Sequence, residues 1–237
     1  MNKAIFTEGM NDLNINISDK QMGQFSYYSR LLVEWNEKMN LTTIVDDDGI
    51  AIKHFIDSIL PLKYIDIPNA VKVADVGTGA GFPGLPIKIM REDIHLTLID
   101  SLNKRVNFLK EVTDKLELSC VDCVHGRAEE LGRNAIYREA FDVVVSRAVA
   151  NLTTLAEYCL PYVKVGGIFI ALKAEDIENE LASAVEIINN LGCTVLEVIK
   201  APLPKSDIVR NLIVIKKLKA TPPKYPRSTK QIKASQE

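Results

Sequence analysis

The sequence predicts an α/β fold in which one mostly parallel, doubly wound sheet follows a helical extension. From Val71 onward, short apolar runs alternate with amphipathic stretches, which is the pattern of successive βαβ units. A glycine-rich turn follows the first of these runs, as expected where a strand of such a sheet leads into a helix. The last two runs are joined by a segment containing Pro202 and Pro204, too short for a parallel crossover. We therefore expect seven strands, the last two forming an antiparallel edge hairpin.

The composition is that of a water-soluble globular chain. Of the 237 residues, 47% are apolar and 25% are charged, which excludes global disorder and a collagen-like fibre. No run approaches the ~20 apolar residues that cross a bilayer, and Lys3, Glu8 and Asp12 interrupt any secretory signal. We expect a cytoplasmic protein without a membrane partner. Four cysteines are too few to cross-link this length, and Cys120 with Cys123 supplies only half of a zinc site, so we expect free thiols and no metal.

Residues 1–69 are predicted to form a helical extension. Ser18 and Gln21 have the spacing of a capping box, and they precede an apolar stripe at helical spacing that includes Tyr28 and Trp35. A second helix is expected to begin at the acidic residues 46–48, because carboxylates complement the positive end of the helix dipole. Apolar residues continue this helix up to Pro61. Its polar face is expected to carry His54, Asp57 and Ser58.

Residues 70–219 are predicted to form the sheet domain. Its strands are expected where the apolar runs are short and rich in valine and isoleucine, at 71–76, 94–99, 118–124, 141–146, 167–173, 193–199 and 212–217. Helices are expected between them where the apolar residues recur at helical spacing, at 85–90, 104–115, 128–133, 152–163 and 177–191.

The C-terminal end is basic although the chain as a whole is slightly acidic. From Lys200 to Glu237 there are ten Lys or Arg against two acidic residues, a net charge of +8, so that the remainder carries −10 of the total of −2. Residues 220–237 contain three prolines and few apolar side chains, and we interpret them as a tail without regular structure. The charge suggests contact with a polyanion such as RNA; the alternative is a solvated terminus.

The glycine-rich turn runs from Asp75 to Gly84. Its glycines allow a tight turn and a close approach of the backbone to a ligand. Gly79, Gly81 and Gly84 match the dinucleotide fingerprint G-x-G-x-x-G, a pattern that is weak on its own and keeps an NAD or FAD enzyme as an alternative. Asp75, two residues before Gly77, would repel a pyrophosphate but suits an ammonium group, directly or through water, which favours an S-adenosylmethionine site.

Two further positions suit the nucleoside part of such a ligand. Asp100 ends the next predicted strand, where a carboxylate can accept hydrogen bonds from both ribose hydroxyls. An NAD enzyme uses the same arrangement, so Asp100 identifies a ribose without identifying the cofactor. Arg127, Ala128 and Glu129 follow the third strand, where small and polar groups can flank an adenine ring. The alternative is an ordinary helix start with Glu129 near its N-terminus.

Together these segments resemble the bacterial ribosomal RNA small-subunit methyltransferase G family, formerly called glucose-inhibited division protein B. The resemblance covers about 35–217 and is carried by residues 75–86 and the following segments: Trp35-Asn36, Asn40-Leu41-Thr42, His54-Phe55, Asp57-Ser58, Leu98-Ile99-Asp100-Ser101, Lys104-Arg105, Ser146-Arg147-Ala148, Gly166-Gly167 and Lys173. The chain departs from the family pattern after Tyr225-Pro226-Arg227, where the usual Gly-x-Pro is missing. The role of the tail in RNA binding is therefore left open.

The resemblance implies a Rossmann-like class I methyltransferase fold. It also implies transfer of a methyl group from S-adenosyl-L-methionine to N7 of a guanine in small-subunit (16S) ribosomal RNA, with that RNA or the ribosomal subunit as partner. No particular oligomer is implied. The implied cofactor contacts are Gly77, Phe82, Ala128, Glu129 and Arg147. On chemical grounds we add the turn glycine Gly79 and the two carboxylates Asp75 and Asp100.

Guanine N7 has a free lone pair at neutral pH, so the expected reaction needs alignment of the reactants and no general base. We expect Arg147 to supply positioning, because an arginine at the carboxyl end of a central strand faces the ligand crevice. The alternative for Arg147 is a structural ion pair. His54, Asp57 and Ser58 are expected to make structural hydrogen bonds or to support the RNA site, and Lys173 either meets a phosphate or is solvated. The competing functions are an NAD-dependent oxidoreductase and a ribosome-assembly binder with a relic pocket.

Overall fold

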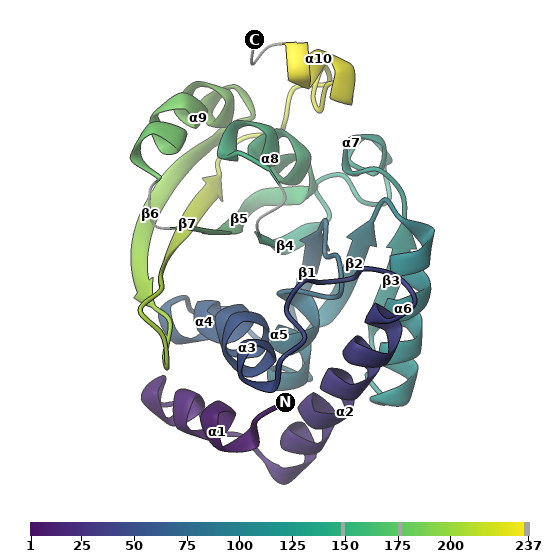
Figure 1. Cartoon of the computed structure of the whole chain (residues 1–237). Helices are drawn as coiled ribbons and strands as arrows, with labels where there is room; N and C mark the ends of the chain where they lie inside the picture. Colours follow the sequence, from purple (N-terminus) through teal and green to yellow (C-terminus); the bar gives the residue numbers. More distant parts are fainter. Residues whose placement is uncertain (148–149, 175–176, 235–237) are drawn as a thin grey trace.

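The computed structural model describes residues 1–147, 150–174 and 177–234, and its centre is one seven-stranded sheet (Figure 1). The strand order is β3-β2-β1-β4-β5-β7-β6, and β7 alone runs antiparallel to the other strands. The predicted sheet and its antiparallel edge hairpin are therefore confirmed. The strands are β1 (Lys72–Val76), β2 (His95–Asp100), β3 (Val121–His125), β4 (Phe141–Arg147), β5 (Val163–Lys173), β6 (Cys193–Pro202) and β7 (Val209–Lys217).

Helices cover both faces of this sheet because successive strand residues point to opposite sides. In β4, Val143 and Val145 join a core with the N-terminal helices and the helices that follow β1 and β2, whereas Val144 joins a second core on the other face. The helices after β4 and β5 cover that second face. The helices between strands are α5 (Gly84–Met90), α6 (Asn103–Lys115), α7 (Ala128–Leu131), α8 (Leu152–Cys159) and α9 (Glu178–Asn190).

The predicted helix 152–163 ends earlier than expected. Helix α8 stops at Cys159, a short 3₁₀ turn Leu160–Tyr162 follows, and β5 begins at Val163. Pro161 has no backbone N–H to continue an α-helix, and the side chains of the turn are buried. Residues 160–163 are therefore apolar because they are buried in the core, and they do not continue helix α8.

The N-terminal extension consists of α1 (Lys3–Asp12), α2 (Asp19–Asn36), α3 (Asp47–Gly49), a π-helix (Ile50–Ile56) and α4 (Asp57–Tyr64). The capping box of Ser18 and Gln21 and the acidic start at Asp46 are confirmed. The helix does not end at Pro61 as predicted, because Leu60 and Tyr64 on either side of it pack against the core and hold the last turn.

The predicted polar face of this helix is buried and does not face solvent. His54, Asp57 and Ser58 are 6%, 1% and 0% exposed, so they point into the protein toward the carboxyl end of the sheet. A π-helix widens the turn just before Asp57, a feature that often marks functional positions. Asp57 is buried because its partners, Arg147 of β4 and Arg210 of β7, lie on strands far away in the sequence, which a periodicity argument cannot reveal.

Residues 220–234 are not a structureless tail. They dock on the molecule and end in the short helix α10 (Thr229–Ala234), drawn in yellow in Figure 1, while residues 235–237 lie outside the described residues. Arg138 donates to the carbonyls of Thr221, Pro222 and Tyr225, and Tyr225 is buried. The low apolar content misled the prediction because arginine donors from the sheet domain also hold this segment. The division into 1–69, 70–219 and 220–237 stays a prediction.

Candidate active site

The glycine-rich turn is closed by hydrogen bonds from two sides. Gly77, Gly79 and Gly81 all have positive φ angles, of 73°, 62° and 98°. The backbone N–H of Gly77 donates to the carbonyl of Ile99 at 2.9 Å, which ties the turn to the end of β2. The turn therefore runs along the carboxyl ends of β1 and β2, where ligands bind in open α/β sheets.

Asp75, near the end of β1, is hydrogen-bonded to this turn. Its Oδ2 accepts hydrogen bonds from the Thr78 hydroxyl and the Gly84 N–H, both at 2.7 Å, and a Cβ on Gly84 would meet the same oxygen at 2.8 Å. The carboxyl is fully buried, and burial raises its pKa to about 7 against the opposing effect of those hydrogen bonds. Its Oδ1 has no hydrogen-bond partner among the described residues. A positive charge nearby would stabilise the ionised form.

A first pocket of about 420 Å³ opens beside the turn, at the ends of β1 and β2 and the start of α7. Asp100 forms part of its wall; Oδ2 of Asp100 accepts from the Gly79 N–H at 2.9 Å, and Oδ1 accepts from the Leu102 N–H at 2.9 Å. Asp75 does not line it. The first pocket is lined by Val76, Gly77, Ile99, Asp100, Ser101, Leu102, Arg105, Gly126, Arg127, Ala128, Glu129, Leu155, Tyr158 and Thr229.

Ala128 and Glu129, at the start of α7, line the first pocket. The carbonyl of Ala128 accepts a hydrogen bond from the Tyr162 hydroxyl at 2.7 Å, which fixes the start of α7 on the sheet domain. The Glu129 carboxylate accepts a hydrogen bond from the hydroxyl of Thr229, a residue of the C-terminal segment. Sequence reasoning placed Ala128 and Glu129 at the site but missed Thr229, for which no local motif exists.

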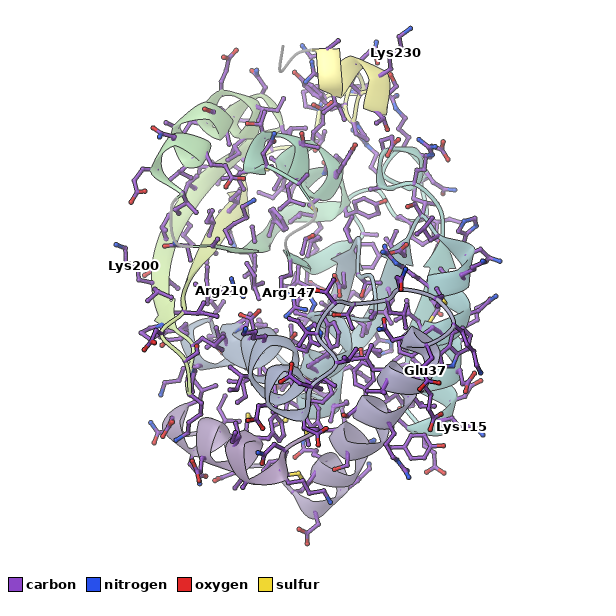
Figure 2. The ribbon with its side chains drawn as sticks, viewed as in Figure 1. Glu37, Lys115, Arg147, Lys200, Arg210 and Lys230 are labelled. Atoms are coloured by element: carbon purple, nitrogen blue, oxygen red, sulfur yellow. The ribbon has the colours of Figure 1, made fainter. Side chains whose placement is uncertain are left out.

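Arg147 ends β4 and reaches into the N-terminal extension. Its Nη1 lies 3.0 Å from Asp57 Oδ2 and 3.0 Å from the carbonyl of Lys53, while Arg210 of β7 lies 2.8 Å from Asp57 Oδ1. One buried carboxylate thus pairs with two arginines from different strands, and Figure 2 shows Arg147 and Arg210 side by side. The structural ion pair considered for Arg147 is present, but the side chain also lines a second pocket. Arg210 was missed because only the fold brings β7 close to Asp57.

Phe82 supports this arginine. The guanidinium carbon of Arg147 lies 5.0 Å from the centre of the Phe82 ring, and His54 stacks on the same ring at 4.5 Å. Burial, and next to it the charge of Arg147, lowers the pKa of His54 to about 4. The Thr42 hydroxyl lies 2.9 Å from Nε2 of the His54 ring. The neutral imidazole thus makes the structural contacts that were one of its two predicted roles, and its support of the RNA site stays a prediction.

The second pocket, of about 350 Å³, lies over the ends of β4 and β5. Lys173 lines it without being solvated; its ammonium donates to the carbonyl of Ala150 at 2.8 Å and lies 2.6 Å from a Glu180 oxygen. Ala148, part of the predicted Ser146-Arg147-Ala148 motif, lies outside the described residues. The second pocket is lined by Ile44, Lys53, His54, Asp57, Arg147, Leu172, Lys173, Ala174, Glu180 and Arg210.

The two pockets share the carboxyl edge of the sheet, one on each side of the boundary between β1 and β4. The strand order reverses at that boundary, and the Ser146 hydroxyl of β4 donates to the Val76 carbonyl of β1 at 2.7 Å. This is the position at which doubly wound sheets bind their ligands. Within the described ranges, no group of His, Cys, Asp or Glu residues could hold a metal ion, and no helix could span a bilayer.

A family model described as rRNA small subunit methyltransferase G matches residues 21–209. The chain belongs to this family. A relative from Clostridium botulinum (strain Loch Maree / Type A3), named ribosomal RNA small subunit methyltransferase G, is 49% identical over 229 residues, which cover 97% of this chain and 96% of the relative. One of the same name from Alkaliphilus oremlandii is 52% identical over 225 residues, covering 95% and 94%.

Solved structures of low sequence identity share the fold. M. jannaschii TYW2 in complex with AdoMet has a TM-score of 0.55 at 16% identity, covering 74% of this chain and 80% of that one. A SAM dependent methyltransferase from Aquifex aeolicus has a TM-score of 0.53 at 18% identity, covering 77% and 97%. The class I methyltransferase fold is thereby confirmed. A [4+2]-cyclase, SpnF, has the same fold (TM-score 0.53, 15% identity, covering 69% and 80%), so the fold alone does not assign the reaction.

Proposed function

We propose that this protein transfers a methyl group from S-adenosyl-L-methionine to N7 of one guanine in small-subunit ribosomal RNA. The observation that carries the proposal is the first pocket beside the glycine turn, in a chain of the methyltransferase G family. We further propose that it acts in the cytoplasm, where ribosomal subunits are present. Family membership and the antiparallel β7 both argue against the NAD-dependent alternative.

The residues of the first pocket fit the proposed cofactor. Asp100 can accept ribose hydroxyl groups with the lone pairs that its two backbone hydrogen bonds leave free. Glu129 and Ala128 offer a carboxylate and a small surface to the base, and Gly77 leaves the backbone open to close approach. Asp75, with its unpartnered Oδ1, would act through the turn and through its charge, since it does not line the pocket.

The chemistry places few demands on the protein. When bound, S-adenosylmethionine supplies a methyl group on a positively charged sulfur; transfer joins that carbon to guanine N7 as the carbon–sulfur bond breaks. No proton leaves N7, so the site needs no base. What this chain contributes is orientation and exclusion of water, which together can supply ~7–11 kcal/mol. The rigid stack of His54, Phe82 and Arg147 beside the strand-order reversal is suited to orientation.

We propose that the guanine approaches from the second pocket. Lys53, Arg147, Lys173 and Arg210 give this pocket four cations against the two carboxylates of Asp57 and Glu180. An excess of positive charge suits a phosphate backbone, and a planar guanidinium can donate to guanine O6. Arg147 is the proposed positioning residue because it alone of these cations also packs on Phe82 of the turn.

Binding calorimetry tests the cofactor. S-Adenosylhomocysteine is expected to bind the full chain with one site, and NAD is expected not to bind. If NAD bound and S-adenosylhomocysteine did not, the methyltransferase proposal would be overturned in favour of an oxidoreductase.

A methylation assay tests the reaction and Arg147. Small subunits from a strain lacking this gene are incubated with the protein and S-adenosylmethionine, and N7-methylguanine is mapped by borohydride–aniline cleavage and primer extension. One new cleavage site is expected. Arg147→Ala should lower the rate about 100-fold, because loss of alignment is costly, whereas folding should lose only ~1–3 kcal/mol because Asp57 keeps Arg210.

The matched control for this variant is Arg30→Ala, which removes an exposed arginine of α2 that stacks on Tyr27 and should leave the rate unchanged. Undiminished turnover of Arg147→Ala would remove this residue from the site. If the wild-type protein bound the subunit tightly but produced no new cleavage site in the RNA, the ribosome-assembly binder would be favoured.

A further inference from the structure

The C-terminal segment, residues 220–234, takes part in the first pocket. Thr229 lines that pocket together with Glu129, Ala128 and Asp100. The Thr229 hydroxyl donates a hydrogen bond to Glu129 Oε1, across 100 positions of sequence. The Glu129 side chain is only 11% exposed, so its carboxylate is held in the wall and does not extend into solvent.

The segment reaches this place because one buried carboxylate anchors it. Glu157 of α8 is 0% exposed and accepts hydrogen bonds from the backbone N–H of Arg227 at 2.6 Å and from its guanidinium at 2.8 Å. A buried carboxylate without a partner would be costly, so this pair favours the docked position strongly. Arg227 immediately precedes Ser228 and Thr229, and the anchor therefore fixes the residue that faces Glu129.

Two arginines of the loop after α7 strengthen the docking. Arg138 donates to three carbonyls of the segment, and Arg133 donates to the carbonyls of Lys224 and Pro226 at 3.0 Å and 2.8 Å. Charge-assisted hydrogen bonds of this kind are stronger than neutral ones. The same loop thus joins the start of α7, where Glu129 lies, to the segment that carries Thr229.

We propose that the C-terminal segment forms a wall of the cofactor pocket and that Thr229 is a positioning residue, which holds the Glu129 carboxylate ready for the donor groups of a bound nucleoside. This inference rests on the proposed function, because the ligand is S-adenosylmethionine or its product. A carboxylate that is already oriented loses less side-chain freedom when the ligand binds, and that difference appears as affinity. Arg227 is engaged by Glu157, so its role here is anchoring.

The test compares variants that differ by one group. The affinity of the full-length protein for S-adenosylhomocysteine is measured by calorimetry for wild type, Thr229→Val and Thr229→Ser. Valine keeps the size but removes the donor, and serine restores it. We expect Thr229→Val to weaken binding about 5- to 10-fold, or ~1–1.4 kcal/mol at tenfold per 1.4 kcal/mol, and Thr229→Ser to stay within about twofold. Lys219→Gln, which changes an exposed lysine just before the segment, is the matched control and should not change affinity.

A chain that ends at Ser228 tests the wall itself. It keeps the Arg227–Glu157 pair and removes α10, so the expected loss of affinity is tenfold or more while the fold is retained. Thermal melting and far-UV circular dichroism check folding. In a Glu129→Ala background, Thr229→Val should have no further effect on affinity, because the hydroxyl acts through that carboxylate.

The outcomes separate the two proposals. If wild type does not bind S-adenosylhomocysteine, the proposed function fails. If wild type binds and Thr229→Val binds equally well, or if valine and serine weaken binding alike, the role of the hydroxyl is overturned. If the shortened chain is folded and binds like wild type, the segment is not a wall of the pocket; if it does not fold, the valine and serine pair decides.

Discussion

At the scale of single residues, the site depends on side chains that are buried in pairs and stacks. His54 and Arg147 lie on one ring, that of Phe82, and the nearest approach between an Arg147 nitrogen and His54 Nδ1 is 3.4 Å. A second positive charge at this place would oppose the guanidinium. The neutral form of His54 is therefore part of what keeps Arg147 paired with Asp57.

This arrangement predicts acid sensitivity. The pKa of His54 is about 4 when folded and about 6.5 when unfolded, so the unfolded chain binds more protons between these values. The contribution of His54 to stability should be full above pH 6.5 and should fall as the pH drops toward 4. Asp75, whose pKa is raised to about 7 when folded, acts in the opposite direction, but its effect is common to wild type and a His54 variant and cancels in the difference between them. Relative to His54→Gln, wild type should lose up to ~3 kcal/mol over this range.

Urea unfolding at a series of pH values measures this effect. His95→Gln, which changes an exposed histidine at the start of β2, is the control and should follow wild type. Parallel curves for wild type and His54→Gln would contradict the assignment of a buried neutral imidazole.

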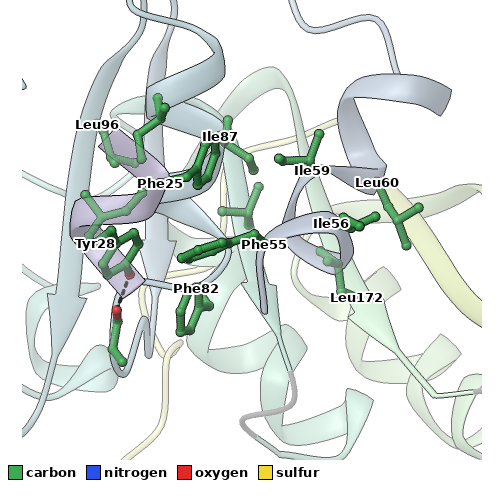
Figure 3. Close-up of a cluster of buried hydrophobic side chains, with 14 of the residues drawn as sticks. Phe25, Tyr28, Phe55, Ile56, Ile59, Leu60, Phe82, Ile87, Leu96 and Leu172 are labelled. Carbon is green, nitrogen blue, oxygen red and sulfur yellow. Dashed lines mark hydrogen bonds between the residues drawn. The ribbon is translucent and has the colours of Figure 1, made fainter. Parts of the chain in front are cut away.

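At the scale of elements, the glycine turn is supported by a helix of the N-terminal extension. Tyr28 of α2 donates a hydrogen bond to the carbonyl of Ala80, shown as a dashed line in Figure 3, and its ring stacks on Phe82 at 5.6 Å. The same helix ends at Asn36, whose side chain accepts from the backbone N–H groups of Leu41 and Thr42. Thr42 in turn contacts His54. The extension therefore shapes the site as well as covering the sheet.

The turn predicts different costs for two similar substitutions. A Cβ on Gly79 would meet nothing within 4 Å, so Gly79→Ala pays only for its positive φ, about 1–2 kcal/mol. A Cβ on Gly81 would lie 2.5 Å from both Leu85 and the Tyr28 hydroxyl, which adds an overpacking cost of ~1–3 kcal/mol. Gly81→Ala should therefore be clearly the less stable variant in urea unfolding. Equal urea midpoints for the two variants would mean that Tyr28 of α2 leaves room for a Cβ at Gly81.

At the scale of the whole molecule, the fold leaves only part of the basic C-terminal charge exposed, a distribution that composition alone does not show. Part of the basic C-terminal charge is neutralised internally, as Arg227 pairs with Glu157 and Lys217 with Glu139. Lys224 and Lys230 remain exposed on the docked segment. Figure 2 shows Lys230 and Lys115 at opposite ends of the molecule.

The distribution predicts which cations affect RNA binding. We expect Lys224→Gln with Lys230→Gln to weaken binding of small-subunit RNA and to reduce the slope of log affinity against log salt by up to about 1.4, because each neutralised phosphate of a single strand accounts for ~0.7 of that slope. Lys3→Gln with Lys115→Gln removes the same charge from the start of α1 and the end of α6, elements that lie away from α10 in Figure 1, and should leave the slope unchanged. Filter binding between low and moderate salt measures both. Identical slopes for the two pairs would reject contact of the segment with RNA.

Sequence alone was sufficient for the features that depend on neighbours in the chain. The seven strands, the capping box at Ser18 and the turn from Asp75 to Gly84 follow from periodicity and from residues with special backbone preferences, which act over a few positions. The antiparallel hairpin followed from the length of one connection. These local rules also located Asp100, Ala128 and Glu129 at the ends of strands, where the first pocket is found.

Tertiary structure alone decided which distant groups meet. Asp57 pairs with arginines 90 and 153 positions away, and Thr229 meets Glu129 over 100 positions. Such pairs form because burying a charged or polar group is favourable only when a partner is supplied, and the partner is set by how the strands and helices pack. For the same reason, a polar helix face became buried and a proline-rich basic terminus became an ordered part of the pocket.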